Sequence, residues 1–132
     1  MSEGLEQQIT RMLASANAEA GYALSLVCTE QGLLVASDGD HWSSEQLAAL
    51  TSLFDDIVVR AQRDLDAHFV DEVTLLDPSS GRIVVRQVPL AGSPRFFLVL
   101  RIPTRARWRR DTNRMVRQLA DWLAPLVEGG SP

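Results

Sequence analysis

Residues 96–102 read FFLVLRI and residues 22–29 read YALSLVCT, and these two stretches decide the fold. In both, apolar or small side chains occupy alternate positions and also most of the positions between them. This pattern is typical of strands that are covered on both faces. We therefore expect the two stretches to be neighbouring strands at the centre of a sheet. The rest of the chain must supply the elements that cover its two faces.

Three more strands and three helices are predicted around this central pair. The strands lie at residues 33–37, 69–76 and 82–89, and turns rich in Gly, Pro, Asp or Ser bound them. Apolar residues at helical spacing predict helices at residues 5–20, at about 44–68, and across Met115 to Leu126. Ser43 and Gln46 match a capping box for the long helix. The predicted core-facing stripe of that helix consists of Leu47, Leu50, Phe54, Ile57, Val58, Ala61 and Leu65.

The element order α-ββ-α-βββ-α predicts an α+β fold in αβα layers with a five-stranded antiparallel sheet. We expect the first and last helices on one face of the sheet and the long central helix on the other. Residues 1–132 fit a single domain, with a core at about residues 5–127 and a flexible tail at residues 128–132.

Charge is divided unevenly along the chain. The first 80 residues contain fourteen acidic residues and three arginines, whereas the remainder contains ten arginines and three acidic residues. The formal net charge of -4 disfavours general binding to nucleic acid or to anionic membranes. The N-terminal segment is acidic and polar, unlike a signal peptide, and no apolar run reaches membrane-spanning length. With a single cysteine, these features predict a cytoplasmic protein with no membrane insertion.

Residues that could support catalysis or metal binding are few and scattered. The two imidazoles, His41 and His68, are distant in sequence, and Cys28 alternates with leucines in a central strand, where a buried, inert thiol is expected. A ligand cluster of Asp38, Asp40 and His41 is conceivable, but Asp-Gly-Asp after a strand is typical of a turn. No glycine-rich phosphate loop occurs. We therefore expect no enzymatic activity, no metal and no cofactor.

Several turn and strand patterns point to one known family. Residues 32–39 read GLLVASDG and precede the long helix, and the strands contain IVV at residues 83–85 and FLVL at residues 97–100. Over roughly residues 5–127 the chain resembles the Roadblock/dynein light chain family. The resemblance implies a homodimer, or a heterodimer with a related Roadblock subunit, in which the long helices pack together and the third strands pair. It also implies a regulatory or scaffold protein that binds a small Ras-like GTPase or related signalling partner and modulates its nucleotide cycle or localisation.

Two elements are candidates for the dimer interface. The third strand contains no Pro or Lys, so as an edge strand it can pair with its copy in a second subunit. The side of the long helix opposite the predicted core stripe mixes small, apolar and polar residues, and it is either a solvated face or a contact with a second copy. The candidate dimer residues are Ala48, Ser52, Asp55, Val59, Gln62, Asp66, Val70, Glu72 and Thr74.

Arginines crowd the entry to the last helix, where the positive end of the helix dipole disfavours cations. Two interpretations stay open. The arginines either pair with the acidic first half of the chain, or they dock an acidic surface of a partner, because Arg and Trp are favoured interface anchors. The candidate docking residues are Arg105, Arg107, Trp108, Arg109 and Arg110.

Two other functions also stay open. A GAF- or PAS-like small-molecule sensor would have an enclosed pocket over the sheet, whereas a docking module would fill that space with Leu, Phe and Val side chains. A purely structural subunit of a larger complex would differ from a regulator only in having no effect on nucleotide turnover.

Overall fold

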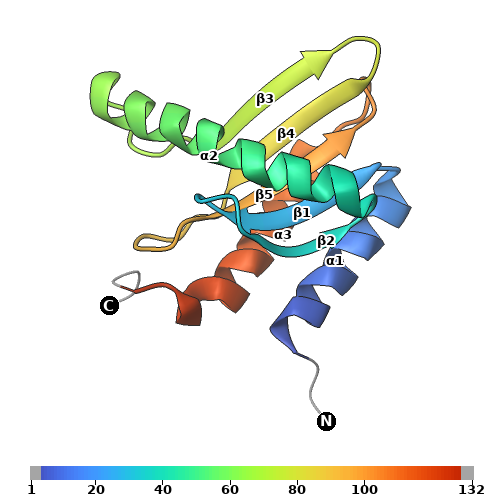
Figure 1. The fold of residues 1–132 in the computed structure, drawn as a ribbon, viewed down its shortest axis with the longest axis horizontal. Helices are drawn as coiled ribbons and strands as arrows, with labels where there is room; N and C mark the ends of the chain where they lie inside the picture. The colour runs from blue at the N-terminus through green and yellow to red at the C-terminus, as the bar shows by residue number, and fades with distance from the viewer. Residues whose placement is uncertain (1–3, 129–132) are drawn as a thin grey trace.

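The computed structural model describes residues 4–128, apart from the side chains of His41 and Trp42, and it has the predicted element order (Figure 1). Its helices are α1 (Leu5–Ala20), α2 (His41–Asp64), α3 (Arg109–Leu123) and a short 3-10 helix, η1 (Ala124–Leu126). Its strands are β1 (Leu24–Thr29), β2 (Leu34–Asp38), β3 (Glu72–Asp77), β4 (Gly81–Gln87) and β5 (Phe96–Ile102).

The five strands form one antiparallel sheet in the order β2-β1-β5-β4-β3. The prediction of a central pair is confirmed, because β1 and β5 are neighbours and Leu26 lies opposite Val99. Both side chains are fully buried. The third strand, β3, lies at one edge of the sheet, which is the position that pairing with a second copy requires, and β2 forms the other edge.

Helices cover both faces of this sheet, as predicted (Figure 1). On one face, α1 and α3 contribute side chains such as Ile9, Leu13 and Leu119 to a core that includes Val27 and Leu98. On the other face, α2 forms a second core with β1 and β5, described below. Each large apolar side chain that is buried in these cores contributes about 1.5–3 kcal/mol to stability.

The side of α2 that faces the sheet differs from the predicted stripe. Ile57 and Leu65 are 51% and 77% exposed, whereas Ala48 and Thr51 are fully buried. The prediction was wrong at these positions because it assigned the largest apolar side chains to the core. A small residue is needed at Ala48 because the helix backbone comes close to the turn between β1 and β2: a Cβ atom on Gly32 would lie 2.8 Å from the carbonyl oxygen of Ala48.

The ends of α2 also differ from prediction. The helix begins at His41 with Asp40 as its N-cap residue, and Ser43 Oγ donates a hydrogen bond to Asp40 Oδ2 at 2.8 Å. The predicted capping box at Ser43 and Gln46 is therefore wrong. The helix ends at Asp64. Two residues later Asp66 has a φ of 59°, a left-handed conformation that stops the helix and that Asp tolerates better than most residues.

The last described residue, Glu128, lies beside the loop that leads into β5. Glu128 and Ser93 form an isolated bridge, with Glu128 N donating to Ser93 O at 2.9 Å. Glu128 is thus held in place, and the remainder of the predicted flexible tail, residues 129–132, lies outside the described residues.

Candidate interaction surfaces

One face of the sheet is only partly covered by the chain itself. α2 packs mainly on β1 and β2, which leaves β4 and the edge strand β3 beside it (Figure 1). Half-buried apolar side chains from α2, β3 and β4 lie at the margin of this core, and Leu53, Ile57 and Leu75 are 61%, 51% and 47% exposed. We call the resulting surface the apolar band, which consists of Leu50, Leu53, Ile57, Val73, Leu75 and Ile83.

The predicted dimer residues are divided between core and surface. Ala48 is fully buried beneath α2, so it is not accessible to a partner and leaves the candidate set. Asp55 forms an ion pair with Arg95, with 2.7 Å between the carboxylate oxygen and Nη2, and Gln62 Nε2 donates to the carbonyl oxygen of His68 at 3.1 Å. Ser52, Val59 and Asp66 are exposed, and Val70, Glu72 and Thr74 are half-buried. These six residues, with Asp55 and Gln62, stay predictions.

A buried arginine joins the start of β3 to the start of α3. Arg86 on β4 is only 2% exposed, and its Nη2 and Nε donate to Asp71 Oδ1 at 2.9 Å and 3.1 Å. Its guanidinium also donates to Thr112 Oγ1 at 2.5 Å and to Asn113 Oδ1 at 2.8 Å. A buried guanidinium is stable only when its donors are paired in this way.

The same acidic segment holds two of the predicted docking residues. Arg109 donates to Asp71 at 2.9 Å and to Glu72 at 3.0 Å, and Trp108 Nε1 donates to Glu72 at 2.9 Å. Burial acts to raise the pKa of Asp71, but hydrogen bonds from Arg109 and Arg86 outweigh it and lower that pKa below its usual range. Internal pairing, one of the two interpretations of the arginines, therefore holds for Arg109. We call the residues of these two paragraphs the Arg86 network.

The other predicted docking residues face solvent. The side chains of Arg105, Arg107 and Arg110 are exposed and form no ion pair with any residue between 4 and 128. Arg107 and Arg110 line an open hollow of about 520 Å³ with Trp108, which is half-buried. The Arg82 guanidinium carbon lies 4.6 Å from the centroid of the Trp108 ring. Four of the five predicted residues, Arg107, Trp108, Arg109 and Arg110, thus line one hollow, and Arg105 lies outside it. The role of the five residues in docking stays a prediction.

Tyr22 fixes the loop that carries these arginines. Its hydroxyl lies 3.2 Å from both the carbonyl oxygen of Arg107 and Asp111 Oδ2. Burial and the adjacent Asp111 carboxylate raise the pKa of Tyr22 to about 12. The phenol therefore stays protonated at neutral pH and serves as a hydrogen-bond donor to the loop.

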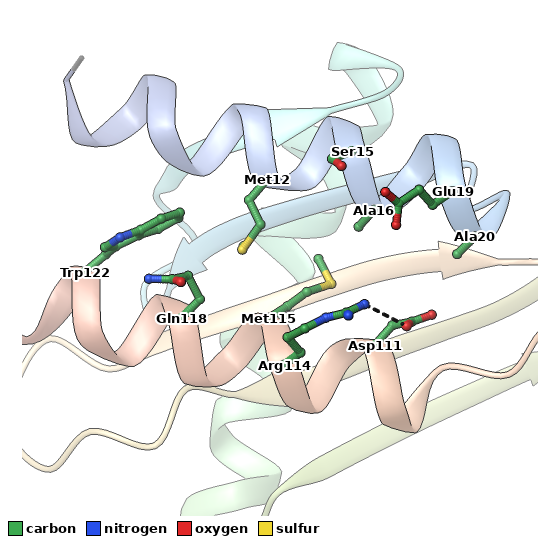
Figure 2. A pocket seen from close by; sticks show the side chains of 10 residues that line it. All are labelled: Met12, Ser15, Ala16, Glu19, Ala20, Asp111, Arg114, Met115, Gln118 and Trp122. Carbon is green, nitrogen blue, oxygen red and sulfur yellow. Dashed lines mark hydrogen bonds and ion pairs between the residues drawn. The ribbon is translucent and has the colours of Figure 1, made fainter. Parts of the chain in front are cut away.

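An open groove of about 570 Å³ lies between α1 and α3, on the face opposite to α2 (Figure 2). The two helices run antiparallel along it, and Met12 and Met115 point toward one another across its floor. The ion pair between Arg114 Nη2 and Asp111 Oδ1, 3.1 Å long, lies at one end. The complete lining is Met12, Ser15, Ala16, Glu19, Ala20, Asp111, Arg114, Met115, Gln118 and Trp122.

The chemistry of the remaining candidates is limited. Cys28 is fully buried, and burial raises the pKa of its thiol to about 11, so the reactive thiolate is scarce at neutral pH. Among the described side chains of residues 4–128, no three metal-ligating groups gather into a possible site. The side chain of His41, a member of the conceivable cluster with Asp38 and Asp40, lies outside the description. In that same part of the chain, none of the helices combines the length and apolar character needed to span a membrane.

The space between α2 and the sheet distinguishes a docking module from a sensor. Phe54 and Val58 of α2 pack there against Phe97 and Val99 of β5, and all four are at most 5% exposed. Packed side chains in this layer are the arrangement expected of a docking module.

Solved structures resemble this chain over nearly its whole length. An MglB structure with a tetrameric arrangement has a TM-score of 0.78 at 16% sequence identity and covers 96% of each chain. MglB of Myxococcus xanthus also has a TM-score of 0.78, at 15% identity, and covers 99% of this chain and 98% of its own. The Roadblock/LC7 domain from Streptomyces avermitilis has a TM-score of 0.65 at 18% identity, with 89% and 92% covered.

The chain has the Roadblock/LC7 fold. The fold that the turn and strand patterns predicted is therefore confirmed. No protein-family model and no curated protein sequence matches the chain, so the likeness lies in the three-dimensional structure.

Within this Roadblock fold, sequence reasoning missed three features. It did not find the apolar band, the groove between α1 and α3, or the Arg86 network. One signal for the network was present: Arg86 alternates with Val84 and therefore points to the α1–α3 face of the sheet, where an unpaired charge is unstable.

Proposed function

We propose that this chain is a dimeric regulatory or scaffold protein of the Roadblock type, which binds a small Ras-like GTPase or a related signalling protein. The Roadblock/LC7 fold of the chain, which solved MglB structures share over nearly its whole length, supports this proposal. The apolar band is the observation on which the proposal depends.

The apolar band supports self-association. Its six side chains come from three adjacent elements, and three of them are about half exposed or more. Large contiguous apolar surfaces are uncommon on monomeric proteins and usually mark an interface. A second copy that covers this surface would remove its apolar area from water, which stabilises the dimer by about 25 cal/mol for each Å² buried.

The edge strand β3 offers a route to a continuous sheet. Its six residues, Glu72–Asp77, contain no Pro or Lys, and one side of the strand has no neighbour within the described part of the chain. Pairing of two such edges about a twofold axis is isologous and satisfies the outward backbone groups of both copies. The apolar band adjoins this edge through Val73 and Leu75, so helix and strand contacts would form together.

Sedimentation velocity tests the dimer. We expect the wild-type chain to be dimeric at micromolar concentration and the double variant Leu53→Glu/Ile57→Glu to be monomeric, because two buried charges would be unpaired in the interface. Leu33→Glu is the matched control, since Leu33 is 62% exposed and lies outside the apolar band. A wild-type chain that sediments as a monomer across this range would refute the proposed dimer.

Binding of a GTPase tests the partner. With a purified Ras-like GTPase of the same organism, loaded with a GTP analogue, we expect Arg107→Glu/Arg110→Glu to weaken binding by at least about tenfold. Arg109 is left unchanged because it belongs to the Arg86 network. Arg11→Glu/Arg117→Glu, at two exposed positions outside the hollow, is the control for net charge, because it changes the charge by the same amount. Equal affinities of Arg107→Glu/Arg110→Glu and wild type would contradict docking through Arg107 and Arg110.

The rate of nucleotide turnover separates a regulator from a structural subunit. A regulator changes the rate of GTP hydrolysis or of nucleotide release when it is added to the GTPase, whereas a structural subunit binds without changing either. We expect the rate to change, with the chemistry carried out by the GTPase and with this chain stabilising its mobile loops.

A further inference from the structure

We propose that the hollow at the start of α3 binds an acidic segment of a partner protein, and that one large apolar side chain of this segment rests on Trp108. This inference rests on the proposed function, because it specifies the chemistry that Arg107 and Arg110 bind. The apolar band shares no residue with the hollow, so the two surfaces are separate. The lining of the hollow, which has a volume of about 520 Å³, is Ala106, Arg107, Trp108, Arg109, Arg110 and Asp111.

Trp108 is held in place by contacts with several parts of the chain. Its Nε1 donates to Glu72 at 2.9 Å, and the Arg82 guanidinium carbon lies 4.6 Å from the centroid of its ring. Its carbonyl oxygen accepts hydrogen bonds from the backbone nitrogen and the hydroxyl of Thr112, at 2.8 Å and 2.7 Å. The ring also packs against the margin of the α1–α3 core. An apolar surface that is fixed in advance binds a ligand at a lower entropic cost than a mobile one.

The charged residues of the hollow differ in whether the chain already pairs them. Arg109 belongs to the Arg86 network, and Asp111 accepts a hydrogen bond from Arg114 Nη2 at 3.1 Å (Figure 2). By contrast, the exposed side chains of Arg107 and Arg110 make no ion pair or hydrogen bond with any residue from 4 to 128. Within that part of the chain, the hollow therefore carries two positive charges that have no counter-charge.

These charges and the Trp108 ring together define the occupant. Two unpaired guanidinium groups favour carboxylates, because Arg binds them with directed, charge-assisted hydrogen bonds. The indole N–H of Trp108 is already bonded to Glu72, so the ring offers its apolar surface to a ligand. Trp and Arg are also favoured anchors in interfaces. A segment that fits both features combines Asp or Glu residues with a large apolar side chain such as Phe or Leu.

A nucleic acid fits the hollow less well than an acidic segment does. Binding sites for nucleic acid require a basic surface that follows the phosphate backbone, and they are typical of basic domains. The formal net charge of this chain is -4, and the unpaired arginines of the hollow are confined to one loop and the first turn of α3. A short peptide segment needs no more than this area.

Fluorescence anisotropy with labelled peptides of about ten residues tests the proposal on the full-length chain. The parent peptide has Asp and Glu on both sides of one Phe and contains no Trp. Replacing the Phe by Ser, or all the acidic residues by their amides, should each weaken binding at least about tenfold, because the anchor or the charges are then lost. A parent peptide that does not bind, or an amide version that binds equally well, would overturn the proposal.

Variants of the chain test whether the peptide binds in the hollow. Arg107→Ala/Arg110→Ala should weaken binding of the parent peptide at least about tenfold. Arg11→Ala/Arg117→Ala is the matched control, because both positions are exposed and lie outside the hollow, and it should leave the affinity unchanged. Circular dichroism establishes that both variants are folded. Equal affinities of the two variants would refute binding at this site.

The fluorescence of Trp108 tests the apolar contact separately. The sequence contains three tryptophans, so Trp42→Phe/Trp122→Phe leaves Trp108 as the only one. We expect its emission to shift to shorter wavelength when the parent peptide binds, because an apolar side chain then replaces water at the ring. The serine version at saturation should shift the emission less. An emission that stays unchanged with the parent peptide at saturation would show that the anchor does not rest on Trp108.

The peptide assay and the GTPase assay can fail independently. A wild-type chain that binds the GTPase but not the parent peptide would overturn this inference and leave the proposed function intact, whereas binding of the peptide alone would overturn only the Ras-like partner. A single-stranded oligonucleotide that binds through Arg107 and Arg110 more tightly than the parent peptide would also overturn the inference. So would a wild-type oligomer that Arg107→Ala/Arg110→Ala dissociates, because the hollow would then hold a second copy.

Discussion

The two faces of the sheet are covered in different ways. α1 and α3 together cover one face, and α2 alone covers the other. Four strand spacings of about 4.8 Å make a five-stranded sheet nearly 20 Å wide between its outer strands, and a helix is about 10 Å across. Two helices therefore match the width of the sheet, with a groove between them, whereas one helix leaves about half of its face open.

This difference separates two kinds of surface in one small protein. On the α2 face, apolar side chains of the sheet and helix extend beyond the area that the chain can cover, which is the apolar band. On the other face the core is closed, and the groove lies above it between the helices. The α2 face thus exposes apolar side chains over a helix and two strands, whereas the exposed surface of the other face is hollowed between two helices.

The sharpest test of this contrast compares two residues of α2. Phe54 is 5% exposed between helix and sheet, so Phe54→Ala should lower the free energy of unfolding by about 3–5 kcal/mol. Ile57, on the next turn of the helix, is 51% exposed, and Ile57→Ala should change the stability of the protomer by less than about 0.5 kcal/mol. Urea denaturation at low protein concentration measures both. Equal losses would show that Ile57 belongs to the protomer core.

On the opposite face, a charged residue should have a comparable effect. Arg86→Ala removes the buried guanidinium that Asp71, Thr112 and Asn113 share, and we expect a loss of about 3 kcal/mol. Arg110→Ala on α3 removes an exposed cation and should cost less than about 0.5 kcal/mol. Denaturant midpoints of the two variants provide the measurement. A loss for Arg86→Ala as small as that for Arg110→Ala would show that the network contributes nothing to stability.

The smallest expected effect is a change in how the free energy of unfolding depends on pH. The pKa of Asp71 is lower in the folded chain than its usual value of about 3.9, so its carboxylate stabilises the fold above that value, and this contribution is lost as pH falls through the folded pKa. We expect the stability difference between wild type and Asp71→Asn to be constant from about pH 5 to 7 and to shrink below about pH 4. The pH-dependent part should be under about 1 kcal/mol, because the side chain is 39% exposed. A difference that does not vary down to pH 2.5 would contradict the lowered pKa.

The sequence was sufficient to predict the layers and the strand neighbours. α1 and β5 begin and end at the predicted residues, because strong periodicity and clear stops at Gly21 and Pro103 bound them. β3 was predicted to begin at Phe69 but begins at Glu72, because the apolar pattern continues over Phe69 and Val70, which precede the residues paired with β4. Local patterns thus identify elements well and their ends less well.

The surfaces were harder to predict, for two physical reasons. Periodicity shows that Leu53 and Ile57 are apolar, but it does not distinguish a side chain that packs within the protomer from one that packs against another chain. The Arg86 network joins residues from 71 to 113, and pairing over such distances depends on strand register and helix position. The groove likewise depends on the spacing of two helices that are distant in sequence.

The half-covered α2 face links the stability of the proposed dimer to protein concentration. When a second copy covers the apolar band, folding and association are coupled, and the dimer gains stability as protein concentration rises. The melting temperature of the wild-type chain should therefore rise as the protein concentration is raised from low to high micromolar. The melting temperature of Leu53→Glu/Ile57→Glu should stay constant over the same range. The concentration of this protein in a cell would then determine its conformational stability as well as the amount available.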